Sequence, residues 1–255
     1  MKFFLVSIVF LYTVIGYAYE YEYKDPTQGK PFVPWLWEDQ FQPTIKESLN
    51  TKGILTLAIG AATTVAAHQY DVDVYSHNTR GKNTLMSNTA TKRLSSIGSG
   101  FLGISVAVGQ ILIDQDNGLM HARAVALTSI SHVTLAYAAH RTRPGNRGDY
   151  LPFPSSFPSG HTSSAFATAT ALSYAYGWKA GVPAFLLATS IGMARVVDNA
   201  HWLSDVTAGA ALGIFWGHAS YEALTKKSNE AESKSVWTPY ISQDGTGVVF
   251  YHALD

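Results

Sequence analysis

The chain has 255 residues, with 18 basic and 18 acidic side chains and no cysteine. The balanced charge argues against a nucleic-acid partner, because proteins that bind nucleic acid carry a surplus of Lys and Arg. The lack of cysteine excludes disulfide bonds, and the length suits one sizeable domain with a large core.

The first residues have the pattern of an export signal. Lys2 supplies a positive start, residues 3–16 are apolar, and Gly16-Tyr17-Ala18 has the small-x-small pattern of a cleavage site. We therefore expect a signal peptide over residues 1–18 and an exported, periplasmic protein. An uncleaved first membrane helix is the alternative, although the apolar run is short for a span.

The rest of the chain predicts an all-α fold with two terminal additions. Residues 19–50 are aromatic and interrupted by prolines, which favours an N-terminal extended arm that ends in a short amphipathic helix near residues 38–49. Residues 51–225 hold apolar runs too long for strands, which predicts a helical domain. We expect a six-helix core bundle, with helices near residues 52–68, 94–113, 121–140, 161–176, 182–197 and 202–224. Residues 226–255 are expected to form a charged linker and a short C-terminal β-hairpin with its turn at Asp244-Gly245.

The relation of these helices to a membrane stays open at this point. Several of them lack charged residues for about the length that a bilayer requires, the segment 94–113 above all. They also carry many Ser, Thr and His side chains, and helices around a large soluble core look the same. We favour a soluble periplasmic bundle, with a membrane-associated or membrane-embedded bundle as the alternative.

The stretch Phe157-Pro158-Ser159-Gly160-His161-Thr162 ends a Pro- and Ser-rich loop and opens a helical run. A helix start presents unpaired backbone N–H groups and a partial positive charge, which attract anions. Ser159 can cap this start, Gly160 lets a ligand approach the backbone, and His161 places a proton donor beside the anion. Taken alone, the stretch fits a capped helix more simply, but two further clusters change that interpretation.

Topology predicts that these clusters meet. If consecutive helices run antiparallel, as short connections favour, the third helix ends where the fourth begins, and the fifth ends where the sixth begins. The residues expected at this one end of the bundle are Arg143, Ser159, Gly160, His161, Arg195, His201 and Asp205. The long polar loop over residues 70–92 should lie there too, and loops of that length often cover binding sites. The N-terminal arm and the C-terminal hairpin should lie at the opposite end.

The residue types in this cluster favour oxyanion chemistry. Two arginines and a helix start suit phosphate, because arginine keeps its charge and forms bidentate contacts with such oxygens. His201 and Asp205 lie one helical turn apart, so the carboxylate can hold one ring nitrogen and leave the other facing the anion. His201 is then a candidate nucleophile and His161 a candidate general acid. The alternatives are a local helix pair and a His/His/Asp metal site, which the arginines disfavour.

Two of these motifs resemble those of the type 2 phosphatidic acid phosphatase superfamily, which includes bacterial class A acid phosphatases, lipid phosphatases and vanadium haloperoxidases. The second motif of that family, Pro-Ser-Gly-His, is present at residues 158–161. The third motif is Ser-Arg, five residues, His, three residues and Asp. It matches at Arg195, His201 and Asp205, with Ala194 in place of the serine. The resemblance covers roughly residues 94–221.

The first motif of the family is incomplete in this chain. It reads Lys, six residues, Arg-Pro, and Arg143-Pro144 match its end while Ala136 occupies the lysine position. A neighbouring cation could replace the lysine, and we expect Arg141, Arg80 or Lys82 to do so. The remaining histidines, His132 among them, are expected to be packing or surface residues, with His140 next to the cluster as the exception.

The resemblance also implies roles for individual residues. The residues that it assigns to phosphate binding are Arg143, Ser159, Gly160 and Arg195. It further implies that His201 attacks phosphorus to form a phosphohistidine, that His161 protonates the leaving oxygen, and that Asp205 orients His201. No metal and no other cofactor is implied.

We therefore expect an exported, metal-independent phosphoric monoester hydrolase similar to the acid phosphatases. Its substrate would be a phosphorylated small molecule or a lipid phosphate. A membrane-associated lipid phosphatase with the same site is the first alternative. The second is a weakened or non-catalytic anion-binding envelope protein, because Ala136 replaces the family lysine. A haloperoxidase is disfavoured, because vanadate would be held less firmly without that lysine.

Overall fold

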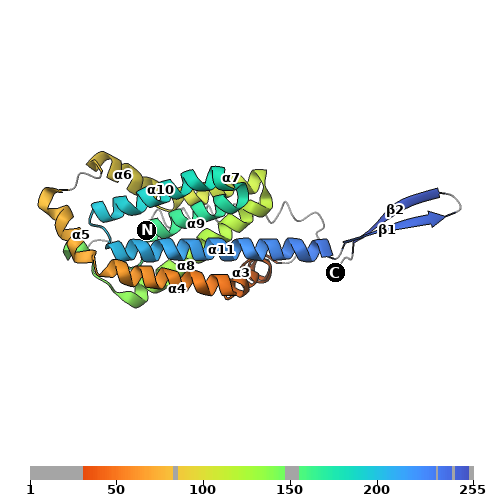
Figure 1. The fold of residues 1–255 in the computed structure, drawn as a ribbon, viewed down its shortest axis with the longest axis horizontal. Coiled ribbons are helices and arrows are strands. Elements are labelled where there is room, and N and C mark those ends of the chain that lie inside the picture. Colours follow the sequence, from red (N-terminus) through yellow and green to blue (C-terminus); the bar gives the residue numbers. More distant parts are fainter. Residues whose placement is uncertain (1–30, 83–85, 147–154, 234, 243–244, 253–255) are drawn as a thin grey trace.

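The computed structural model describes residues 31–82, 86–146, 155–233, 235–242 and 245–252. Its fold is a bundle of helices, as the sequence predicts (Figure 1). The predicted signal peptide over residues 1–18, and the part of the predicted arm before residue 31, lie outside the described residues.

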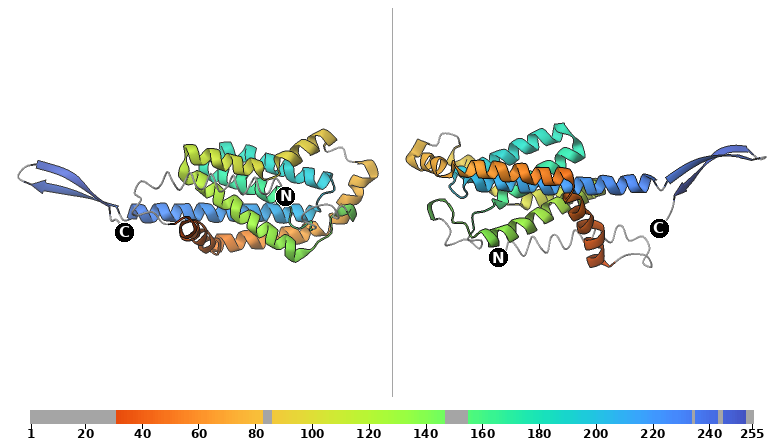
Figure 2. Two further views of the ribbon diagram at one scale, coloured as in Figure 1. Left: turned by 180° about the vertical axis from the view of Figure 1, so that it is seen from behind. Right: turned by 60° about the horizontal axis from the view of Figure 1, so that its bottom comes forward.

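The long C-terminal helix is the central element of the bundle. The core helices are α4 (Thr51–His68), α7 (Phe101–Ile113), α8 (Gln115–Ala139), α9 (Gly160–Tyr176), α10 (Trp178–Val197) and α11 (Leu203–Ser233). Helix α11 packs against α4, α8 and α9, α10 packs on α9, and α7 packs on α8 (Figures 1 and 2).

Three glycines on α11 let α9 approach it closely. Gly209, Gly213 and Gly217 are spaced by four residues and therefore share one face of the helix. A Cβ at Gly209 would lie 2.6 Å from the Ser159 carbonyl oxygen, and one at Gly217 would lie 2.6 Å from Thr170 Cβ. Small residues at a helix interface allow this close backbone contact. The stripe thereby fixes the start of α9 against α11, where the predicted site residues lie.

The segment predicted as one helix over residues 94–113 is two helices. Helix α6 (Asn88–Ile97) and helix α7 meet at a bend of 46°. At the junction Gly100 has a φ of 86°, in the left-handed region that glycine adopts without strain. The apolar pattern continues across this junction, so periodicity alone did not reveal the break.

The N-terminal segment is helical where it is described, and not extended. It consists of α2 (Phe32–Trp35), a π-helical turn η1 (Leu36–Phe41) and α3 (Gln42–Ser48), which packs on α11. Pro43 lies in the first turn of α3, where the missing backbone N–H costs no hydrogen bond. The prolines that indicated breaks are therefore compatible with short helices.

The C-terminal part differs from the predicted linker. Helix α11 continues to Ser233, so most of the residues expected in a charged linker are helical. Strands β1 (Ser235–Ser242) and β2 (Gly245–His252) follow and pair antiparallel, with Ser242 opposite Gly245. The hairpin extends from the end of α11 away from the bundle (Figures 1 and 2).

The loop predicted over residues 70–92 contains helical segments, and it lies at the predicted end of the bundle, away from the hairpin (Figure 1). Helix α5 (Asp71–His77) and the π-helical turn η2 (Asn78–Lys82) follow α4 directly. The Asn78 side chain donates a hydrogen bond of 3.1 Å to the Val196 carbonyl, which ties η2 to the end of α10. A short 3-10 turn, η3 (Pro144–Asn146), follows α8 nearby.

Among the described helices, α10 has the length and hydropathy of a membrane span, and the bent pair α6 and α7 reaches the same criterion when its two helices are taken together.

Candidate active site

Residues from several elements meet where α8 and α10 end and where α9 and α11 begin. Arg143 Nη1, in the segment after α8, lies 3.1 Å from His201 Nε2, just before α11. The Ser159 backbone N–H at the start of α9 donates to the Asp205 carbonyl at 2.9 Å. The His201 backbone N–H donates to the Arg195 carbonyl at the end of α10, at 3.3 Å. The structure therefore brings these predicted residues into one cluster.

The two ring nitrogens of His201 have different surroundings. Nδ1 lies 2.7 Å from the Ser156 carbonyl oxygen, which can only accept a hydrogen bond, so Nδ1 carries the proton. The lone pair of the neutral ring is then on Nε2, next to Arg143. Burial lowers the pKa of His201; Asp205 acts to raise it, while Arg143 and Arg195 act with burial. His201 is therefore a neutral imidazole at physiological pH, with its unprotonated Nε2 facing a guanidinium group.

The expected hydrogen bond between Asp205 and His201 is not made. His201 Nδ1 and Asp205 Oδ2 are 3.8 Å apart, beyond hydrogen-bond distance. Asp205 Oδ2 accepts instead from the Trp202 backbone N–H at 2.8 Å, and Oδ1 accepts from Arg141 Nη1 at 2.6 Å. The Ser156 carbonyl takes the place that we expected for the carboxylate. A backbone carbonyl leaves no side-chain pattern, so the sequence could not indicate it.

Arg141, which we expected to replace the missing lysine, is held by two carboxylates. Its Nη2 contacts Asp71 Oδ2 at 2.7 Å, and its Nη1 contacts Asp205 Oδ1 at 2.6 Å. Its guanidinium carbon lies 5.6 Å from the ring centre of Trp202. The charge of Arg141 is thus committed to these acids, which corrects the expectation that it substitutes for the lysine.

The other two residues expected to replace the family lysine are Arg80 and Lys82, and no contact that the structure describes places either of them in the cluster. Arg80 is exposed on η2, and the side chain of Lys82 lies outside the described residues. Ala136 itself is buried, with 4% of its surface exposed.

Asp71 is a residue of the cluster that the sequence analysis missed. It is 3% exposed and accepts hydrogen bonds from the Ser204 backbone N–H at 2.9 Å and from Ser204 Oγ at 2.6 Å. Burial alone would raise the pKa of Asp71, but hydrogen bonds from Ser204, Arg141 and His68 outweigh it and lower the pKa. Asp71 therefore stays ionised and links α5 to the start of α11. No motif pointed to it, because its partners are far away in the sequence.

Two arginines of the cluster are held in place by hydrogen bonds to neighbouring groups. Arg143 is held by the Ala200 carbonyl at 2.7 Å and the Ser155 carbonyl at 3.2 Å, and Arg195 donates to Ser95 Oγ at 2.9 Å. In both arginines Nε is buried and has no hydrogen-bond partner among the described residues. Buried N–H groups without partners are rare, and two fixed guanidinium groups that retain such donors suit a bound oxyanion.

Ser159 and Gly160 are in the cluster, but their contacts differ from those expected. Ser159 Oγ accepts from Thr162 Oγ1 at 2.9 Å and makes no capping hydrogen bond to the backbone of α9. Because this oxygen accepts, the Ser159 hydroxyl can donate its own proton to an anion. A Cβ at Gly160 would lie 2.7 Å from His132 Nε2, so the glycine is required by the histidine ring packed against it.

His132 of α8, which we expected to be a packing or surface residue, packs against Gly160 of the cluster. Its ring contacts Gly160, and its Nδ1 is buried without a hydrogen-bond partner among the described residues. A signal was present in the sequence: His132 precedes Ala136 by one helical turn and therefore shares its face of α8.

His161 lies in the first turn of α9 among positive charges. Burial lowers its pKa to about 3, and Arg195, His201, Arg143 and His132 act in the same direction. His161 is therefore neutral until an anion binds. A bound phosphate would offset the arginine charges and favour the protonated ring. Among the described residues, no group of three His, Cys, Asp or Glu side chains could hold a metal ion.

Comparison with known families and curated proteins places the cluster in context. The model of the PAP2 superfamily matches residues 118–229. The chain is similar to the lipid A 1-phosphatase of Porphyromonas gingivalis, with 35% identity over 132 residues, which are 51% of this chain and 27% of that protein. It is also similar to the lipid A 4′-phosphatase of Helicobacter pylori, with 42% identity over 62 residues, 24% of this chain and 30% of that protein. The chain thus spans less than a third of the length of these curated relatives.

Two solved structures share the fold. The crystal structure of Aquifex aeolicus LpxE aligns with a TM-score of 0.52 and 23% identity, over 60% of this chain and 94% of that one. A transmembrane PAP2 type phosphatidylglycerolphosphate phosphatase from Bacillus subtilis aligns with a TM-score of 0.53 and 19% identity, over 74% of this chain and 96% of that one. At these identities the likeness concerns the fold alone.

Proposed function

The chain carries a domain of the PAP2 superfamily over residues 118–229, and from this premise we propose that it is a membrane-associated phosphatase that hydrolyses a lipid phosphate monoester. The two curated relatives are named as lipid A phosphatases. These names favour a lipid substrate over the small soluble phosphate ester that the sequence analysis placed first. Export through the expected signal peptide stays a prediction.

The arrangement of His201 is the observation that carries the proposal. A nucleophilic imidazole has to be neutral, correctly protonated and fixed in orientation. The Ser156 carbonyl at 2.7 Å holds the proton on Nδ1, and burial with two nearby arginines keeps the ring neutral. Nε2 faces Arg143 at 3.1 Å, so a phosphoryl group bound to that arginine would lie beside the lone pair.

The reaction follows in two steps. In the first, the lone pair of His201 Nε2 forms a bond to phosphorus while the bond from phosphorus to the ester oxygen breaks. His161, protonated once phosphate is bound, gives its proton to the departing oxygen and becomes neutral. In the second step, neutral His161 takes a proton from water, whose oxygen attacks phosphorus. The bond between phosphorus and Nε2 breaks, and inorganic phosphate leaves with His201 restored.

Charge stabilisation comes from groups that are already fixed in place. The unpaired Nε groups of Arg143 and Arg195, together with the Ser159 hydroxyl, can donate to the phosphoryl oxygens. Preorganised donors of this kind stabilise the charge that develops in the transition state. We therefore propose that hydrolysis needs no metal ion. Asp205 acts on His201 indirectly, because it holds the start of α11 and Arg141 in place.

A turnover assay on the purified full chain in detergent tests the proposal. Phosphate release would be measured from a diacyl lipid phosphate and from lipid A, for the wild type, for His201→Gln and for the control His77→Gln. His77 is exposed on α5, so its substitution should leave turnover unchanged. We expect His201→Gln to lower turnover to that of a reaction without enzyme. Equal turnover in both variants would refute the nucleophile, and wild type that binds phosphate without releasing any would support the non-catalytic alternative.

A further inference from the structure

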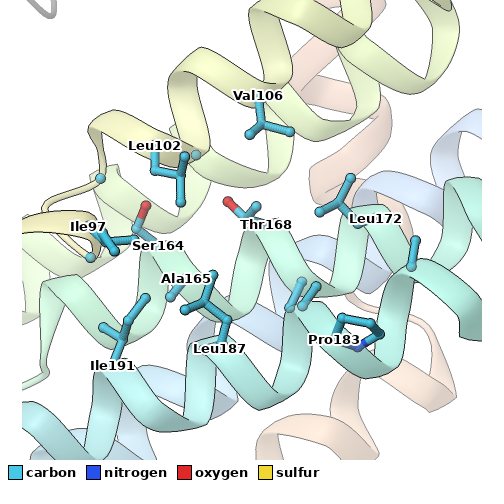
Figure 3. A pocket seen from close by; sticks show the side chains of 17 residues that line it. Ile97, Leu102, Val106, Ser164, Ala165, Thr168, Leu172, Pro183, Leu187 and Ile191 are labelled. Carbon is cyan, nitrogen blue, oxygen red and sulfur yellow. The ribbon is translucent and has the colours of Figure 1, made fainter. Parts of the chain in front are cut away.

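An apolar groove runs beside the active site between α7, α9 and α10. It encloses about 320 Å³ (Figure 3). Leu102 and Val106 of α7 line one side, Leu187 and Pro183 of α10 line the other, and residues of α9 lie between them. Thr168, one of its few polar residues, already contacts His121 at 3.0 Å. The groove therefore offers apolar surface with little capacity for new hydrogen bonds.

One end of the groove adjoins the residues that would hold phosphate. Gly98 and Ile191 line this end, and a Cβ at Gly98 would lie 3.5 Å from His161 Cβ. Arg195 lies one helical turn after Ile191 on α10 and donates to Ser95 Oγ of α6 at 2.9 Å. Helices α6 and α10 thus carry residues of both the polar cluster and the apolar groove.

The dimensions and the walls of the groove fit a lipid chain. Its lining on α10 runs from Ala180 to Ile191, about 16 Å along the helix axis, close to half of the roughly 30 Å hydrocarbon core of a bilayer. Its walls belong to α10 and to the bent pair α6 and α7, the described elements with the hydropathy of a membrane span. Leu186 on α10 is 65% exposed, and Leu112 on α7 is 69% exposed.

We propose that this groove binds one acyl chain of the substrate, with the phosphate group of the same lipid at the His161 end. The inference rests on the proposed lipid phosphatase function and extends it to the part of the substrate that is not phosphate. Binding of the chain would fix the ester oxygen beside His161, because Gly98 at this end of the groove lies next to His161. Selectivity for acyl length should follow from the length of the groove.

A series of lipid phosphates with increasing acyl length, together with variants along the groove, tests the proposal. Ala180→Phe places a ring at the end of the groove far from His161, and Ala184→Phe places one a helical turn nearer to His161. Leu186→Phe is the matched control, since Leu186 lies on the same helix, is exposed and does not line the groove. Nitrophenyl phosphate, which has no acyl chain, reports the phosphate site in every variant.

In the wild type, kcat/KM should rise by about fourfold for each added methylene until the groove is filled. The rise should stop at a shorter chain in Ala180→Phe and at a still shorter one in Ala184→Phe, with nitrophenyl phosphate turnover unchanged. Leu186→Phe should behave like the wild type. If Ala184→Phe fails to fold, the comparison of Ala180→Phe with the wild type still tests the proposal, because the rise in kcat/KM should stop at a shorter acyl chain in the variant.

Two outcomes would overturn the inference while leaving the proposed function intact: a rate independent of acyl length, or unchanged chain-length limits in both groove variants. Failure of the wild type to hydrolyse any lipid phosphate, while nitrophenyl phosphate is turned over, would instead remove the lipid phosphatase function on which the inference rests.

A second inference concerns the missing lysine and rests on different contacts. His132 shares a face of α8 with Ala136, its ring packs on Gly160, and its Nδ1 is buried without a partner among the described residues. We infer that His132 takes the place of the lysine and donates from its protonated ring to a bound phosphate. Burial lowers the pKa of His132 to about 4; His201 and Arg143 act in the same direction, the Pro158 carbonyl acts to raise the pKa, and His161 is a further titratable group close to the ring. A bound phosphate dianion would also raise the pKa of His132 and so favour the protonated ring.

Inhibition by vanadate, measured as a function of pH, tests this inference in the full chain. His132→Gln should weaken inhibition by roughly tenfold to a hundredfold, and most strongly at acidic pH. Ala136→Lys should have little effect on its own, because His132 already makes the contact expected of the lysine. In the His132→Gln background, Ala136→Lys should restore tight inhibition. Unchanged inhibition in His132→Gln, or strong tightening by Ala136→Lys alone, would show that the place of the lysine is vacant and would overturn the assignment.

Discussion

Removal of one charge from the acid pair around Arg141 gives the sharpest test of how the active-site end is held together. In Asp71→Asn the side chain keeps its shape and loses its charge. Arg141 then loses one of its two carboxylate partners, at 2.7 Å, and keeps Asp205 at 2.6 Å. The amide nitrogen of the new side chain must also face either the Ser204 backbone N–H or the cation, and both are donors.

The size of the effect follows from burial. Asp71 is 3% exposed, while the Arg141 side chain is 23% exposed and can partly recover contact with water. Breaking a fully buried pair costs about 3–5 kcal/mol, so we expect about 3 kcal/mol here. For a chain of this length that is a fall in Tm of about 6–12 °C. Turnover should fall as well, because Asp205 and the start of α11 are held through the same arginine.

The assay is thermal unfolding of wild type, Asp71→Asn and the control Asp73→Asn in one detergent. Asp73 is exposed on the same helix, so its loss should change the stability by about 0.5 kcal/mol or less. The pKa of Asp71 is lowered in the folded state, so its stabilisation is present above the unfolded value of 3.8 and is lost as the pH falls through the folded value. The gap between Asp71→Asn and wild type should therefore narrow in strong acid. Equal Tm values for the two variants at neutral pH would refute the reasoning.

Three further outcomes are expected. In the free enzyme the pKa of His201 is lowered, so the acid limb of kcat/KM should lie below pH 6.5; a limb above that value would contradict the assigned nucleophile. Chelators should leave phosphate release unchanged, and a loss of turnover restored by zinc or magnesium would favour metal chemistry instead. Gly160→Ala would place a Cβ 2.7 Å from His132 Nε2, so it should lower turnover by displacing that ring, whereas Gly109→Ala, with open space around it, should not.

The sequence by itself determined the fold class and much of the candidate site. Apolar periodicity over long runs is a local property of helices, and it located α4, α8, α9, α10 and α11 to within a few residues at most ends. The spacing of Arg195, His201 and Asp205, together with the Pro-Ser-Gly-His stretch, pointed to an oxyanion site before any contact was known. Antiparallel packing of consecutive helices predicted that these two motifs lie at the same end of the bundle.

The tertiary structure alone decided which groups touch. The proton on His201 is fixed by the carbonyl of Ser156, and a carbonyl is common to every residue type, so no sequence pattern marks it. Arg141 had the right position to replace a lysine, but two carboxylates hold it, one of them on α5 far away in the sequence. The place of His132 beside the cluster depends on its contact with a glycine of another helix, which no sequence pattern marks. Composition and spacing report local geometry, whereas these assignments depend on contacts between distant segments, which only the folded chain provides.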